Sequence, residues 1–110
     1  MTFYDQMVKD LFKTAPDETG MARMRDYYDL LHGASGLVQE AVEVLEIIHK
    51  HVFFGKEIDF DHLKSEIGDC EFYLTALHQR MYLTREQTRE DNWNKLMSRH
   101  KSGRVEDYYE

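Results

Sequence analysis

The sequence has one cysteine, one proline and no long hydrophobic run. The single cysteine, Cys70, excludes an intrachain disulfide, and its apolar surroundings suit a small buried side chain better than a reactive thiol. No apolar stretch approaches the roughly 18 to 20 residues of a membrane span, and the N-terminal segment lacks the apolar core of a signal peptide. We therefore expect a cytoplasmic protein that does not contact a membrane.

Positive charge is also scarce, since 14 basic residues stand against 21 acidic ones and the formal net charge is -7. Duplex nucleic acid and anionic membranes both require a basic surface, so neither is an expected partner. The length of 110 residues suits one domain, residues 1–110, with one hydrophobic core and one main site. Bound cations would offset part of the acidity.

No strand-like alternation of useful length occurs, and apolar residues recur at helical spacing. The predicted helices span Phe3 to Lys13, Met21 to about His51, about Phe60 to Met81, and Thr84 to about His100, with residues 101–110 as a tail. The predicted fold class is therefore all-α, as a small four- to five-helix bundle.

Local signals mark the helix limits. Pro16 falls in an expected turn over residues 15–20, Asp59 or Asp61 would cap the third helix, and Thr84 with Gln87 forms a capping box. Residues 53–59 are expected to form a loop with buried aromatics. Residues 33–36, Gly-Ala-Ser-Gly, predict a kink, a close approach by another backbone or a ligand, or simple helix packing. Gly68 predicts a close approach of the facing helix.

The most informative pattern is a pair of acidic motifs in matching apolar frames, residues 37–44 and 63–70. The motifs are Glu40 with Glu43 and Glu66 with Asp69. Residues three apart are neighbours on one helix face, so each pair flanks an apolar stripe. If the two stripes pack together, four carboxylates converge.

Four converging carboxylates repel one another, and desolvation raises the cost of keeping them ionised. A hard divalent cation relieves this repulsion, and Mg²⁺ is the natural choice because it takes a few carboxylates together with waters and substrate phosphates. The pattern thus indicates phosphate chemistry. The alternative is that both pairs lie on solvated helix faces and bind no metal.

Four blocks of the chain resemble the MazG-type all-α nucleoside triphosphate pyrophosphohydrolases. The blocks are Gly36 to Val44, Lys50 to Lys56, Glu66 to Asp69 with Tyr73-Leu74, and Asn92 to Arg99, within residues of about 30–100. The resemblance implies a MazG-like fold and Mg²⁺-dependent hydrolysis of a nucleoside triphosphate to the monophosphate and pyrophosphate, with Mn²⁺ as a substitute ion.

By position, the resemblance assigns metal binding to the acids Glu40, Glu43, Glu66 and Asp69, and substrate binding to Asn92, Lys95 and Arg99. The chain departs from the family pattern just beyond, with His100 in place of the usual aromatic and Lys101 in place of a frequent proline. We take Glu43 as the candidate general base. Tyr73 and Trp93 are candidates for stacking on a base, or else core residues.

We expect a homodimer or homotetramer, because aromatic residues make up 13% of the chain and exceed what a small core needs. Two other functions remain open. A non-catalytic helical module would bind nucleotide, metal or a partner protein without turnover. A carboxylate-bridged di-iron bundle would need a Glu-x-x-His motif in each half, but only Glu46 to His49 supplies one. The six histidines show no spacing typical of a zinc site.

Overall fold

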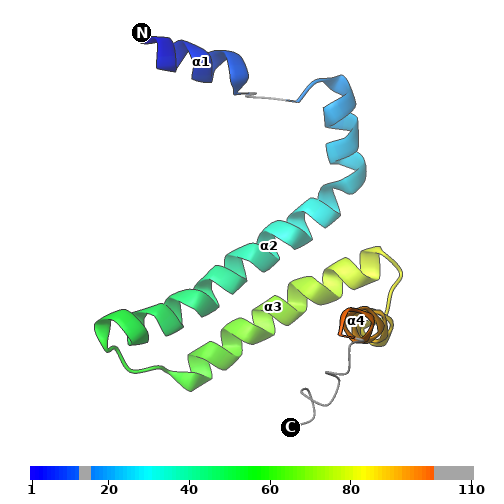
Figure 1. The fold of residues 1–110 in the computed structure, drawn as a ribbon. Coiled ribbons are helices and arrows are strands. Elements are labelled where there is room, and N and C mark those ends of the chain that lie inside the picture. The colour runs from blue at the N-terminus through cyan, green and yellow to red at the C-terminus, as the bar shows by residue number, and fades with distance from the viewer. Residues whose placement is uncertain (13–15, 101–110) are drawn as a thin grey trace.

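The computed structural model describes residues 1–12 and 16–100, and in these ranges the chain forms helices and no strands (Figure 1). The helices are α1 (Phe3–Leu11), α2 (Glu18–Phe54), α3 (Phe60–Arg80) and α4 (Arg85–Arg99). The all-α prediction is confirmed. The predicted end of the first helix at Lys13, the break at Lys101 to Arg104 and the tail at 101–110 lie outside the described residues.

Helix limits follow the capping signals. Asp59 caps α3, accepting hydrogen bonds from the backbone N–H groups of Asp61 and His62, and Thr84 with Gln87 forms the capping box of α4. α2 is longer than predicted at both ends. It begins inside the expected turn because the Asp17 side chain accepts from Gly20 N, and it ends at Gly55, which adopts φ 70°.

The helices α2 and α3 lie side by side as an antiparallel hairpin (Figure 1). Gly33 and Gly36 of α2 are buried where α3 crosses them, against Leu77 and Tyr73. The glycines thus permit a close approach and do not kink the helix; the distortion in α2 occurs earlier, at Tyr27 (φ -122°, ψ 19°). The predicted close approach of the facing helix at Gly68 was wrong for the single chain, because no atom of another element lies within 4 Å of a Cβ placed there.

Only α2 and α3 pack extensively, whereas α1 and α4 lie beyond the hairpin (Figure 1). The predicted hydrophobic core is absent from the single chain, because no apolar side chain among the described residues is buried. The predicted buried aromatics of the loop are likewise exposed, at 69% for Phe53 and 78% for Phe54. Two paired helices form one layer and leave their outer faces in water.

The radius of gyration is 20.5 Å, compared with about 13 Å for a compact domain of about this length. The chain is therefore open and elongated. Among the described residues, no helix combines the length and the apolarity needed to cross a bilayer.

Substituting Gly36 with alanine tests the helix contact that aligns the hairpin. A Cβ at Gly36 would overlap the ring of Tyr73, so Gly36→Ala should lower the free energy of unfolding by about 1 to 3 kcal/mol. The exposed neighbour Ser35 provides the control, because Ser35→Ala should change the same quantity by less than about 0.5 kcal/mol. Urea denaturation measures both; equal stability of the two variants would contradict the contact.

Candidate metal centre

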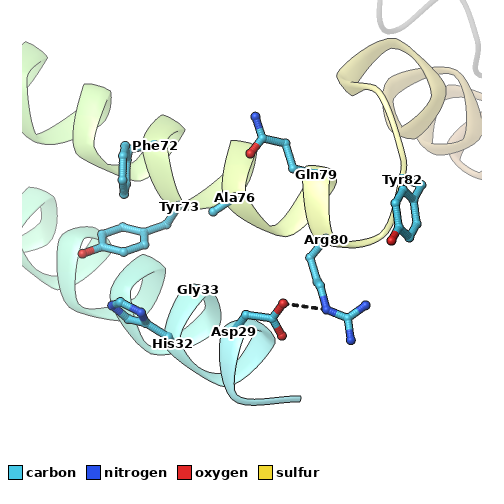
Figure 2. A pocket seen from close by; sticks show the side chains of 9 residues that line it. All are labelled: Asp29, His32, Gly33, Phe72, Tyr73, Ala76, Gln79, Arg80 and Tyr82. Carbon is cyan, nitrogen blue, oxygen red and sulfur yellow. Dashed lines mark ion pairs between the residues drawn. The ribbon is translucent and has the colours of Figure 1, made fainter. Parts of the chain in front are cut away.

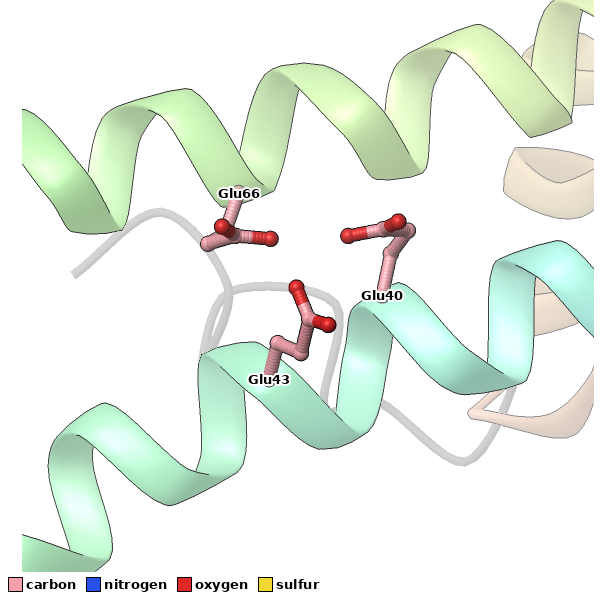
Figure 3. Close-up of side chains that lie close together, drawn as sticks. All are labelled: Glu40, Glu43 and Glu66. Atoms are coloured by element: carbon pink, nitrogen blue, oxygen red, sulfur yellow. The ribbon is translucent and has the colours of Figure 1, made fainter.

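The hairpin brings together three of the four predicted acidic residues. Glu40 and Glu43 lie one turn apart on α2, and Glu66 faces them from α3 (Figure 3). One carboxylate oxygen from each residue lies within 4.8 Å of one from each of the other two. We call these three side chains the carboxylate cluster.

The cluster is sheltered from water. Glu66 is 9% exposed and is the one charged or polar residue classed as buried among the described residues. Its Oε2 atom and the Oε2 atom of Glu40 are inaccessible to water and have no hydrogen-bond partner. The other oxygen of Glu66, Oε1, lies 3.2 Å from Nε2 of His62, one turn earlier on α3. Two carboxylate oxygens thus lack the partners that buried polar atoms normally have.

Proximity of like charges shifts the ionisation of the cluster. Contact with the Glu66 carboxyl is the largest of the causes that raise the pKa of Glu40 to about 7; desolvation and the charges of Glu43 and Asp69 add to it. The pKa of Glu66 is also raised, chiefly by the Glu43 carboxyl. Desolvation and the nearby carboxylates raise the pKa of the Cys70 thiol too, which agrees with an unreactive Cys70.

These features fit a hard divalent cation. Oxygens on opposite sides of a magnesium ion lie about 4.2 Å apart, so the observed spacing requires only small side-chain adjustments. A cation between the helices would give the two unpartnered oxygens a ligand and remove the repulsion among the acids. The donor set contains only oxygen, which Mg²⁺ and Mn²⁺ prefer over the nitrogen and sulfur ligands of zinc.

Asp69 is the predicted ligand that lies outside the cluster. It is exposed on α3, one turn after Glu66, and its charge contributes to the raised pKa of both Glu40 and Glu66. It therefore lies at the edge of the site, near enough to act electrostatically and beyond the spacing that the other three share.

The predicted substrate-binding residues lie on α4, away from the cluster. Asn92 lines a cavity of about 620 Å³ between α3 and α4. Lys95 and Arg99 are exposed on the same helix. An ion pair from Arg85 to Glu71 and a 2.8 Å hydrogen bond between His78 and Thr88 join α4 to α3. Helix α4 begins beyond the end of α3 (Figure 1), and no residue of α4 belongs to the carboxylate cluster.

An aromatic cavity lies toward the open end of the hairpin, between α2 and α3. Its volume is about 510 Å³, and its lining includes His32, Phe72, Tyr73 and Tyr82 (Figure 2). An ion pair of 2.6 Å between Arg80 and Asp29 joins α3 to α2 at its rim. The sequence pattern indicated Tyr73 as a candidate for stacking, but it did not indicate that other rings gather around it.

The half-motif of a di-iron site is not part of the cluster. Glu46 and His49 are both exposed, and the His49 ring lies 4.6 Å from the ring of Phe53. The contact of His62 with Glu66 escaped the sequence analysis, although the spacing of four residues on a helix could have revealed it.

The raised pKa of Glu40 predicts how the stability of the metal-free protein depends on pH. The pKa in the folded state, about 7, exceeds the ordinary value of 4.5, so ionisation of this group opposes folding. Stability should therefore fall as the pH rises from about 4.5 to about 7 in the presence of a chelator. Glu40→Gln should reduce this fall to the part that the raised pKa of Glu66 contributes, and it should be the more stable protein at pH 8.

Urea denaturation across this pH range, with Glu46→Gln as the control, measures the effect. The control removes an exposed glutamate from the same helix and should keep the wild-type dependence. Parallel curves for the wild type and Glu40→Gln would contradict the mutual repulsion within the cluster.

A comparison with known families matches one segment of the chain that runs from within α2 through α3 and α4. The sequence model of the MazG nucleotide pyrophosphohydrolase domain matches residues 31–103, well over half of the chain. The match includes the carboxylate cluster, Asp69 and the polar residues of α4. No curated protein and no solved structure matches the chain significantly.

Proposed function

The chain belongs to the MazG nucleotide pyrophosphohydrolase domain family, and we propose that it is a Mg²⁺-dependent enzyme that converts nucleoside or deoxynucleoside triphosphates to monophosphates and pyrophosphate. The observation that carries the proposal is the convergence of Glu40, Glu43 and Glu66, with two buried oxygens that lack a partner. The family match and the site chemistry thus support the same reaction.

Glu40, Glu43 and Glu66 would hold the ion, and Asp69 would join them from the edge of the site. When bound, Mg²⁺ supplies charge neutralisation of the phosphates and lowers the pKa of a coordinated water, and Mn²⁺ can take its place. The carboxylates fix the position of the reaction between the two helices. The buried glycines allow α2 to lie close to α3 next to these acids.

Glu43 is the best-placed general base. The Oε2 atoms of Glu40 and Glu66 are shielded from water, whereas Glu43 is half-buried and has no oxygen that is both shielded and unpartnered. In the proposed step, a water oxygen forms a bond to the α-phosphorus and its proton passes to Glu43. The bond between the α-phosphorus and the bridging oxygen breaks, and pyrophosphate leaves with the electron pair.

The aromatic cavity offers a place for the nucleoside. Tyr73 lies one turn after Asp69 on α3, and its ring lines the cavity together with Phe72 (Figure 2). Stacking of a base on an aromatic ring contributes about 1 to 3 kcal/mol and does not depend on the identity of the base. We therefore assign Tyr73 to the nucleoside and not to catalysis.

We further propose that the protein acts as a homodimer or homotetramer. Large apolar side chains on the hairpin remain in water in the single chain, among them Ile67 at 49% and Phe72 at 67% exposure. A second copy would cover them and could bring Asn92, Lys95 and Arg99 to the carboxylate cluster of its partner. Sedimentation should give a multiple of 13.2 kDa, whereas a monomer at micromolar concentration would contradict this assembly.

Release of pyrophosphate from a panel of ribo- and deoxyribonucleoside triphosphates tests the activity. The wild type should release it with Mg²⁺ or Mn²⁺ and not with chelator. Glu43→Gln should lower kcat by about 100-fold or more, because a general base is lost. Glu46→Gln, on the same helix and outside the cluster, should retain wild-type activity.

Each alternative has its own outcome in this assay. Nucleotide binding without turnover in the wild type would identify a non-catalytic module. Release of orthophosphate in place of pyrophosphate would show that cleavage occurs at the γ-phosphorus, and it would contradict the proposed position of the reaction.

A further inference from the structure

A smaller cavity adjoins the carboxylate cluster at the closed end of the hairpin. Its volume is about 220 Å³, and it is lined by Ile47, Lys50, Lys56, Glu57, Asp59 and His62. Ile47 and Lys50 follow Glu43 by one and two turns on α2, and His62 contacts Glu66 directly. The cavity therefore lies next to the cluster, between α2 and α3.

Backbone hydrogen bonds hold the two lysines at this end. Gly55 ends α2 with φ 70°, and its N–H donates to the carbonyl oxygen of His51 at 2.9 Å. The next N–H, of Lys56, donates to the carbonyl oxygen of Lys50 at 3.2 Å, and Nδ1 of His51 lies 3.0 Å from the carbonyl oxygen of Lys56. These bonds place the backbone of Lys56 beside that of Lys50.

The lining of this cavity carries two lysines and two acids, Glu57 and Asp59, and within the described part of the chain neither lysine is held in an ion pair. The carboxylate of Asp59 accepts hydrogen bonds from two backbone N–H groups of α3, both at 3.1 Å. Neither Lys50 nor Lys56 forms an ion pair with an acid in residues 1–12 and 16–100. An ammonium group without an acidic partner is a suitable donor to a phosphate oxygen.

The order of these groups along the hairpin is informative. From the open end of the hairpin to its closed end, α2 carries His32, then the acids of the cluster, then Lys50. In the same direction, α3 carries Tyr73, then Glu66, then His62. An aromatic region, an acidic region and a region with two lysines thus follow one another. A nucleoside triphosphate has the same order of parts: the base, the α-phosphate that reacts, and the two terminal phosphates.

We infer that Lys50 and Lys56 form the subsite for the β- and γ-phosphates, which leave as pyrophosphate. The inference rests on the proposed function and adds to it the direction of the substrate, with the terminal phosphates at the closed end of the hairpin. When the bond to the α-phosphorus breaks, the departing oxygen gains negative charge. The two ammonium groups stabilise that charge and hold the product.

Equilibrium binding of inorganic pyrophosphate tests the subsite without turnover. In the presence of Mg²⁺, calorimetry should show that Lys50→Gln/Lys56→Gln binds pyrophosphate at least about tenfold more weakly than the wild type, because charged hydrogen bonds are lost. Binding of a nucleoside monophosphate, which lacks the terminal phosphates, should remain unchanged. Lys64→Gln, compared with Lys50→Gln and Lys56→Gln each alone, controls for the loss of one positive charge, since Lys64 is exposed on α3 and does not line the cavity.

The outcomes separate the subsite from the proposed function. Unchanged pyrophosphate binding in the double variant, equal weakening in Lys64→Gln, or equal weakening for the monophosphate would each overturn the subsite. If the wild type hydrolyses triphosphates and the double variant binds pyrophosphate normally, the subsite is wrong and the function stands. If no triphosphate is hydrolysed but pyrophosphate binding depends on both lysines, the function is wrong and the subsite stands.

Discussion

The repulsion among Glu40, Glu43 and Glu66, held face to face by the pairing of α2 with α3, is the constraint on which the rest of the structure depends. The pairing is possible because two glycines let α3 cross α2 closely at Tyr73 and Leu77. It brings the carboxylates to within 4.8 Å of one another and raises the pKa of Glu40 to about 7. If this arrangement served packing alone, the repulsion would lower the stability of the fold at neutral pH, and nothing would offset that loss. A bound divalent cation would offset the same repulsion.

The open shape of the single chain connects the site to assembly. The hairpin has one internal contact face, where glycines and acids lie with half-buried apolar residues such as Leu77, and many other large apolar side chains remain exposed. The open shape of the single chain also separates α4 and its polar residues from the carboxylate cluster (Figure 1). Assembly would therefore do two things at once, covering apolar surface and supplying the substrate groups of one copy to the acids of another. In the proposed assembly, a domain with so little buried surface would obtain from a second copy both the cover for its apolar faces and the substrate groups that its own acids lack.

Local sequence signals predicted much of the fold and most of the site. Spacing of three residues placed each acidic pair on one helix face, and capping residues such as Asp59 and Thr84 marked where helices begin. The rotation of α3 about its axis was not predictable, and it puts Glu66 inward while Asp69 remains at the edge. The exposure of Phe53 and Phe54 was missed because burial of an aromatic side chain depends on elements far away in the chain. Lys50 and Lys56 lie on different elements, so their proximity follows from the structure of the turn between α2 and α3 and not from their spacing in the sequence.

The most direct test of the central claim is the position of a Mn²⁺ ion in a crystal of the wild-type protein, located by its anomalous scattering. The account predicts a peak between α2 and α3 within coordination distance of Glu40, Glu43 and Glu66, and no such peak in Glu66→Gln. A crystal that contains Mn²⁺ elsewhere, with the three carboxylates unligated, would contradict it.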